Sequence, residues 1–170
     1  MAGPAQGGPP DELGFVPIEA RHLDALTELF RRNRDSAVGR TFDPFELSPE
    51  HATRIALEPR KDRYYAATHG VLLLAMSMLR GYEEGFVVPS FGVFVDARHQ
   101  GEGIGRRLTK WTIEQAHLQG SPAVRLSVYS DNPRAHGLYE SLGFHEQERE
   151  PVDRDGVAVE KIVMRLELAR

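Results

Sequence analysis

Apolar residues recur along the chain at helical spacing in some segments, and this predicts four helices. In residues 19–32, side chains three and four positions apart form one stripe: Leu23, Leu26, Leu29 and Phe30. A second helix is predicted to begin at Ser48-Pro49-Glu50, with serine as its N-cap, and to end at Pro59. A long third helix has the stripe Ile104, Leu108, Trp111, Gln115 and Leu118, and a fourth covers residues 132–141.

Shorter apolar runs between turn residues predict seven strands, at residues 15–18, 63–68, 71–79, 86–95, 123–129, 144–151 and 157–168. Residues 40–47 are predicted to form a loop. The element order is β-α-α-β-β-β-α-β-α-β-β, which is typical of an α/β (α+β) fold. We expect a mixed central sheet of about seven strands flanked by about four helices, with one parallel βαβ unit around the third helix.

The first residues differ in composition from the rest of the chain. Residues 1–12 are rich in glycine and proline, and they contain too few large apolar side chains to offset the entropy lost on ordering. We therefore predict a disordered lead-in over residues 1–12. The remaining residues, 13–170, suit one domain with its own hydrophobic core.

A glycine-rich turn joins the strand at 86–95 to the long helix. It reads Gln100-Gly101-Glu102-Gly103-Ile104-Gly105. A strand–turn–helix of this kind directs the free N–H groups of a helix N-terminus to one point and favours the binding of an anion. Glycine-rich turns also form ordinary connections between a strand and a helix, without binding a ligand. The glycine spacing does not match the dinucleotide fingerprint G-x-G-x-x-G. The phosphate-loop pattern is excluded as well, because no Lys-Ser or Lys-Thr pair follows.

A second motif follows the predicted strand at 123–129. It runs from Asn132 to Phe144 as N-P-R-A-H-G-L-Y-E-S-L-G-F. This segment resembles the N-x-x-A-x-x-L-Y-x-x-L-G-F signature of the GNAT acetyltransferase superfamily, and the Q-x-x-G-x-G turn resembles that family's loop for the pyrophosphate of acyl-coenzyme A. The resemblance covers residues 91–144 and implies a sheet that splays apart between its fourth and fifth strands.

The resemblance also implies a cofactor, acetyl-CoA, and the residues that bind it. Backbone groups of the fourth strand would pair with the pantetheine amides, loop N–H groups would hold the pyrophosphate, and an asparagine would reach the pantetheine from the other side. In this chain the implied cofactor-binding residues are Phe94, Val95, Gln100, Gly101, Gly103, Ile104, Gly105, Arg106 and Asn132. Glu102 departs from the pattern, because family members often carry a basic residue there.

The implied reaction is direct transfer of the acetyl group to a primary amine. Such a transfer needs an uncharged amine and a proton for the departing thiolate, and a tyrosine hydroxyl is an acid that keeps its proton at neutral pH. Tyr139 is the candidate general acid, and Glu84 and Glu83 are candidates for the general base. Each has a simpler interpretation: a packed core tyrosine, and two solvated acids in a connection. Asn132 would likewise serve as a plain helix cap.

Composition narrows the chemistry further. Cysteine is absent, which excludes disulfides and an acyl-cysteine intermediate, and the seven histidines show no metal-ligand spacing. The net charge of −4 argues against a nucleic-acid partner and favours a cationic amine. No apolar run is long enough to span a membrane and no signal peptide is recognised, so a cytoplasmic protein without a membrane partner is expected.

Two functions therefore stay open. The first is an acetyl-CoA-dependent N-acetyltransferase without a metal, acting on a small-molecule or peptide amine. The alternative is a non-catalytic acyl-CoA-binding sensor or regulatory module. The final pair of strands would also offer an edge for a homodimer.

Overall fold

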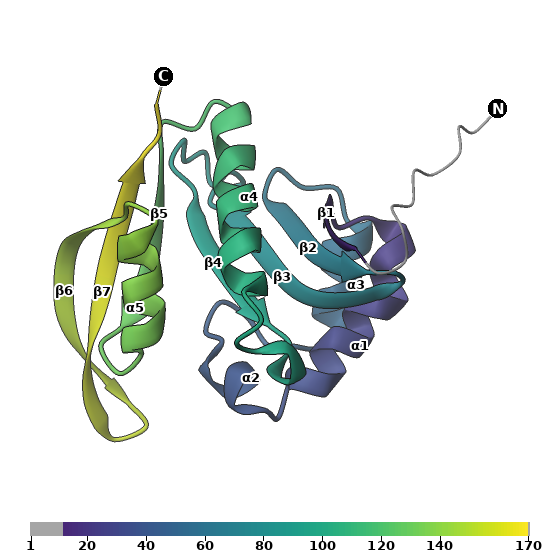
Figure 1. Cartoon of the computed structure of the whole chain (residues 1–170), viewed down its shortest axis with the longest axis horizontal. Helices are drawn as coiled ribbons and strands as arrows, with labels where there is room; N and C mark the ends of the chain where they lie inside the picture. The colour runs from purple at the N-terminus through teal and green to yellow at the C-terminus, as the bar shows by residue number, and fades with distance from the viewer. Residues whose placement is uncertain (1–11, 170) are drawn as a thin grey trace. The chain divides into compact units, whose positions relative to one another are not determined.

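The structure is a computed structural model that describes residues 12–169 (Figure 1). The predicted lead-in at 1–12 therefore lies, apart from Glu12, outside the described residues. The strands are β1 (Leu13–Pro17), β2 (Arg63–His69), β3 (Leu72–Arg80), β4 (Ser90–Val95), β5 (Ala123–Tyr129), β6 (His145–Arg154) and β7 (Val157–Glu167). The helices are α1 (Leu23–Asn33), α2 (Ala37–Thr41), α3 (Pro49–Leu57), α4 (Ile104–Leu118) and α5 (Pro133–Ser141).

The seven strands form one hydrogen-bonded sheet in the order β1-β2-β3-β4-β5-β7-β6. Strands β4 and β5 are parallel, and their described pairing joins Ser90 to Arg125, at the start of β4. Strand β7 lies between β5 and β6 and is antiparallel to both. The predicted α/β (α+β) fold with a mixed sheet of seven strands is confirmed.

The chain divides into two compact units. The first contains the described residues up to 59, together with 64–77 and 93–108. Its core is built on the apolar stripe of α1, where Leu26, Leu29 and Phe30 are fully buried. Helices α1 and α3 pack against each other, and in Figure 1 both pass behind strands β2 and β3.

The second unit contains residues 60–63, 78–92 and those from 109 onward. Strand β5 alternates between buried and exposed residues, and its buried residues face inward beside those of β7. The β6–β7 hairpin turns at Asp155 and Gly156, which both have positive φ. Helix α5 contacts β5, as Figure 1 shows for this part of the chain.

Two sequence predictions differ from the structure. Residues 86–89 are not part of a strand: β4 begins at Ser90, and the side chains of Phe86 and Val87 are exposed. A short helix, α2, occupies residues 37–41, at the start of the expected loop, and it makes a fifth helix. The Ser36 hydroxyl caps it by accepting the Gly39 N–H at 3.2 Å. The short α2 contains a glycine and a β-branched valine, so apolar periodicity could not reveal it.

Candidate functional site

The glycine turn leads from the end of β4 into α4. The Gln100 side-chain amide donates a hydrogen bond to the Val95 carbonyl at 2.7 Å, and so ties the turn to the last residue of the strand. Gly101 and Gly103 have φ values of +79° and +80°. Residues with a Cβ rarely adopt this conformation, so the turn requires glycine at both positions. A Cβ added at Gly103 would meet nothing within 4 Å, which means that conformation alone demands this glycine.

Gly105 has a different role. It lies in the first turn of α4, and a Cβ there would stand 3.2 Å from Cγ2 of Val95. Its missing side chain therefore lets the helix start lie close against β4. This arrangement directs the first turn of α4, with its N-terminal partial positive charge, at the end of the strand. The predicted contacts of Gly101, Gly103, Ile104, Gly105 and Arg106 with a pyrophosphate stay predictions.

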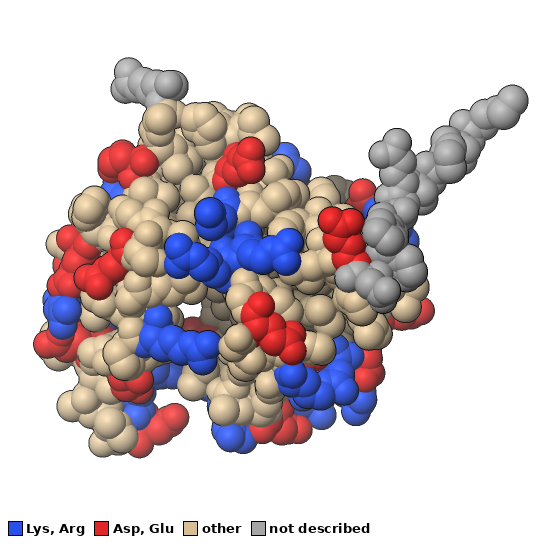
Figure 2. All heavy atoms as spheres, viewed as in Figure 1, with Lys and Arg blue, Asp and Glu red and all other residues tan. Residues whose placement is uncertain are grey.

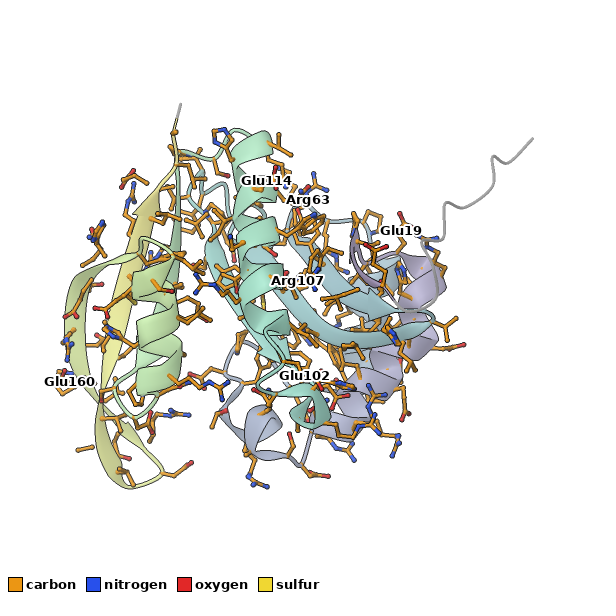
Figure 3. The ribbon with its side chains drawn as sticks, in the orientation of Figure 1. Glu19, Arg63, Glu102, Arg107, Glu114 and Glu160 are labelled. Carbon is orange, nitrogen blue, oxygen red and sulfur yellow. The ribbon has the colours of Figure 1, made fainter. Side chains whose placement is uncertain are left out.

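Charged side chains surround this helix start. In Figure 2, basic side chains gather over α4, which carries the exposed residues Arg106, Arg107 and Lys110. The Arg107 guanidinium lies 5.5 Å from the centre of the Phe15 ring. The Glu102 carboxylate, labelled with Arg107 in Figure 3, lies 3.0 Å from the His99 Nδ1. The acid that departs from the family pattern is thus held by a neighbouring histidine.

A buried polar cluster at the end of β4 was missed by the sequence analysis. The Asp96 carboxylate is 1% exposed and accepts hydrogen bonds from the Arg32 side chain and the Arg98 N–H. Burial opposes its ionisation, but these donors outweigh that effect and lower the pKa of Asp96. The fully buried Asn33 accepts the Ala97 N–H at 2.9 Å. No local pattern pairs residues 64 positions apart, so only the folded chain reveals this cluster.

Helix α5 carries the second motif. The Asn132 carboxamide oxygen accepts the Ala135 N–H at 3.2 Å, and Pro133 follows in the first turn. This confirms the interpretation of Asn132 as a helix cap. Cofactor binding by Asn132 stays a prediction. The capping bond uses the oxygen alone, and among residues 12–169 no protein acceptor bonds to the amide nitrogen.

Tyr139 lies two turns further along α5, and its side chain is half-buried. Its ring makes edge-to-face contacts with Phe91, at 6.3 Å between centroids, and with Phe144, at 5.8 Å. Burial raises the pKa of Tyr139 to about 12. Within the described chain its hydroxyl has no hydrogen-bond partner, and its oxygen is not among the fully buried polar atoms that lack one. This side chain therefore combines a packed ring with a proton available to a ligand.

The two candidate bases have different surroundings. The Glu83 carboxylate accepts the backbone N–H groups of Lys61 and Asp62. Its own N–H donates to the Asp62 carboxylate at 3.2 Å, so Glu83 helps to close the connection between β3 and β4 onto the start of β2. Glu84 is exposed, and no described residue bonds to its carboxylate. Of the pair, Glu84 keeps a carboxylate that is free to accept a proton.

The described residues hold no group of three or more histidine, aspartate or glutamate side chains arranged to bind a metal ion. None of the helices between residues 12 and 169 is long and apolar enough to cross a membrane.

Phe94, a predicted cofactor-binding residue, is buried, and its ring packs against Phe30 and Phe42. Because the side chain is used in this packing, Phe94 can contact a ligand only through its backbone in β4.

Comparison with known proteins agrees with this fold. The described structure superposes on yncA of Salmonella typhimurium, solved with its cofactor acetyl-CoA, with a TM-score of 0.74 and 20% identity over 94% of this chain and 96% of that one. It also superposes on the spermidine/spermine N-acetyltransferase SpeG of Vibrio cholerae, with a TM-score of 0.71 and 19% identity over 92% of this chain and 95% of that one. The chain therefore has the fold of an acetyltransferase.

Sequence comparison gives the family. The sequence model of the acetyltransferase (GNAT) family matches residues 23–144, which is more than half of the chain. This protein belongs to that family. The ribosomal protein bS18-alanine N-acetyltransferase of Escherichia coli is 39% identical over 56 residues, which make up 33% of this chain and 38% of that enzyme. The chain thus aligns with well under two thirds of this relative.

Proposed function

We propose that this protein transfers the acetyl group of acetyl-CoA directly to a primary amine, with Tyr139 as the general acid. Family membership and fold support the cofactor and the type of reaction. The observation that carries the catalytic assignment is the Tyr139 hydroxyl, which keeps its proton at neutral pH and has no hydrogen-bond partner among residues 12–169. A sensor that binds acyl-CoA without reacting would have no need of such a hydroxyl.

In the proposed reaction the uncharged amine nitrogen attacks the carbonyl carbon of the thioester. A C–N bond forms, the C–S bond breaks, and Tyr139 gives its proton to the departing sulfur to release CoA as a thiol. The new amide nitrogen loses a proton, which restores the phenol through the base or solvent.

We assign the general base to Glu84 first and to Glu83 second. Glu84 is exposed and its carboxylate is free, whereas the Glu83 carboxylate is held by two backbone N–H groups. The Glu83 carboxylate is thus engaged with the backbone, whereas Glu84 can turn toward an acceptor without breaking a hydrogen bond. Glu83 therefore has a structural role that accounts for its position without catalysis.

The acceptor is proposed to be a primary amine of either a small molecule or a peptide. The E. coli relative is named for the alanine of a ribosomal protein, and the V. cholerae enzyme for spermidine and spermine. The net charge of −4 favours a cationic acceptor of either kind. A homodimer and a cytoplasmic location stay predictions.

The test measures release of the CoA thiol from acetyl-CoA with a panel of polyamines, amino sugars and short peptides with free N-termini. Hydrolysis without acceptor is the control. Acetylated product identified by mass spectrometry, formed in step with thiol release, would support the proposal. Tight binding of acetyl-CoA without turnover on any acceptor in the panel would favour the sensor instead.

A further inference from the structure

The end of β4 is held to the rest of the first unit by buried charges. Asp96 is 1% exposed, and its Oδ2 accepts Nε of Arg32 at 2.9 Å and lies 2.7 Å from the second terminal nitrogen of that guanidinium. The same guanidinium donates to the Leu73 carbonyl at 3.2 Å, on the neighbouring strand β3. Burying a charged pair costs desolvation free energy, and a well-packed apolar pair in its place would often stabilise the fold equally. The stability of the fold is therefore a weak explanation for the presence of this ion pair.

The cluster does fix the backbone that enters the glycine turn. The Asp96 Oδ1 accepts the Arg98 N–H at 3.1 Å, and the Asp96 carbonyl accepts the His99 N–H at 2.8 Å. The Asp96 N–H donates to the Leu74 carbonyl at 2.8 Å. Three consecutive loop N–H groups, from Ala97 to His99, are thus bonded to Asp96 or to Asn33.

Asn33 extends this hold to α1. Its oxygen accepts the Ala97 N–H at 2.9 Å and its nitrogen donates to the Leu29 carbonyl at 2.9 Å, and the whole side chain is buried. Arg32 and Asn33 are consecutive residues in the last turn of α1. The end of one helix therefore sets the starting position and direction of the turn that leads to Gly101 and Gly103.

We propose that Asp96, held by Arg32 and assisted by Asn33, is a positioning residue for the pyrophosphate part of the cofactor site. This proposal rests on the proposed function. A binding loop gives its full affinity when its donors are held in place before the ligand arrives, because no ordering cost is then left for binding. Loss of the Asp96 charge removes its ion pair with Arg32 and weakens its bond with the Arg98 N–H, so the chain that enters the glycine turn is held less firmly.

The test compares two thioesters in the full chain. Acetyl-CoA contains the pyrophosphate, and the acetyl thioester of pantetheine lacks it. Asp96→Asn keeps the size of the side chain but removes the charge that pairs with Arg32. We expect calorimetry to show at least about a tenfold weaker Kd for CoA, equal to about 1.4 kcal/mol. The kcat/KM with acetyl-pantetheine should stay within about twofold of the wild type, because that substrate has no group for the loop to bind.

Matched variants separate positioning from general damage. Arg32→Lys keeps a charge and should recover part of the affinity lost in Arg32→Met. Asn33→Ala leaves both charges in place, and should weaken CoA binding even if Asp96→Asn fails to fold. Arg31→Met breaks an exposed ion pair with Glu28 on the same helix, and it should change neither the Kd for CoA nor the kcat/KM with acetyl-pantetheine.

Equal losses with both thioesters, or an unchanged Kd for CoA in folded Asp96→Asn and Asn33→Ala, would overturn the positioning role. Failure of the proposed function has a different signature. In that case the wild-type protein itself would turn over neither thioester, whether or not it binds CoA, whereas failure of the positioning role leaves wild-type turnover intact.

Discussion

Replacing Tyr139 with phenylalanine separates a catalytic hydroxyl from a packing ring. The substitution keeps the edge-to-face contacts with Phe91 and Phe144, and within the described chain it breaks no hydrogen bond of the hydroxyl. The substitution therefore removes neither a packing contact nor a hydrogen bond within the described residues. We expect Tyr139→Phe to match the stability of the wild type within about 1 kcal/mol, which corresponds to about 2–4 °C in Tm.

The activity of Tyr139→Phe, in contrast, should fall. Loss of a general acid typically lowers the rate about 10²–10⁴-fold, which is about 3–5 kcal/mol of transition-state stabilisation. The loss should appear in kcat, with calorimetry showing an unchanged Kd for acetyl-CoA. Single-turnover kinetics ensure that the chemical step is observed. Tyr65→Phe, at a buried tyrosine of strand β2, is the matched control and should keep its kcat.

The raised pKa of Tyr139 gives a second, independent readout at alkaline pH. The unfolded chain ionises this tyrosine near pH 10, while the folded chain holds the proton until about pH 12. The folded state then binds more protons than the unfolded state, so its stability falls as pH rises from 10 to about 12. Tyr139→Phe lacks this contribution, so its stability relative to the wild type should rise across that window.

A kcat within about threefold of the wild type, with chemistry limiting, would refute the general-acid role. Departure of the thiolate would then depend on solvent or on the helix start. A lowered Tm together with unchanged kcat would instead return Tyr139 to a simple packing role.

Substitutions at three further positions, Gly103, Glu84 and Asn132, test the rest of the site, each with a comparison variant. Gly103→Ala and Gly70→Ala both place a Cβ in open space at positive φ, so each should lose about 1–2 kcal/mol of stability, but only Gly103→Ala should weaken CoA binding in calorimetry. Glu84→Gln should lower kcat/KM most at low pH, where deprotonating the acceptor amine is hardest. Glu83→Gln should instead lower the Tm. Identical pH–rate profiles for the wild type and Glu84→Gln would place the general base elsewhere. Asn132→Ser keeps a helix cap, whereas Asn132→Ala removes it at a cost of about 1 kcal/mol of stability. If both variants raise the KM for acetyl-CoA equally, the Asn132 amide binds the cofactor. If Asn132→Ser has the KM of the wild type, capping is the whole role of Asn132.

Local sequence was enough for the features that depend on near neighbours. Apolar spacing predicted α4 as the helix from Ile104, and the run Ala123–Tyr129 coincides with β5. The Ser48 cap and the glycines at 101 and 103 follow the same logic, because a cap or a positive φ is decided by residues within one turn. The glycine turn and the Asn132–Phe144 motif also carried the family resemblance, since both are contiguous segments.

Tertiary structure decided which distant groups meet. The pairing of Arg32 with Asp96 joins residues 64 positions apart, and the Glu83 carboxylate meets backbone from 22 positions earlier. The placement of β7 between β5 and β6, and the unpaired hydroxyl of Tyr139, likewise depend on how whole elements pack. Side-chain spacing reports which face of an element is buried but not what that face contacts. The partners that fix the loop and leave the tyrosine proton free are therefore set by the folded chain.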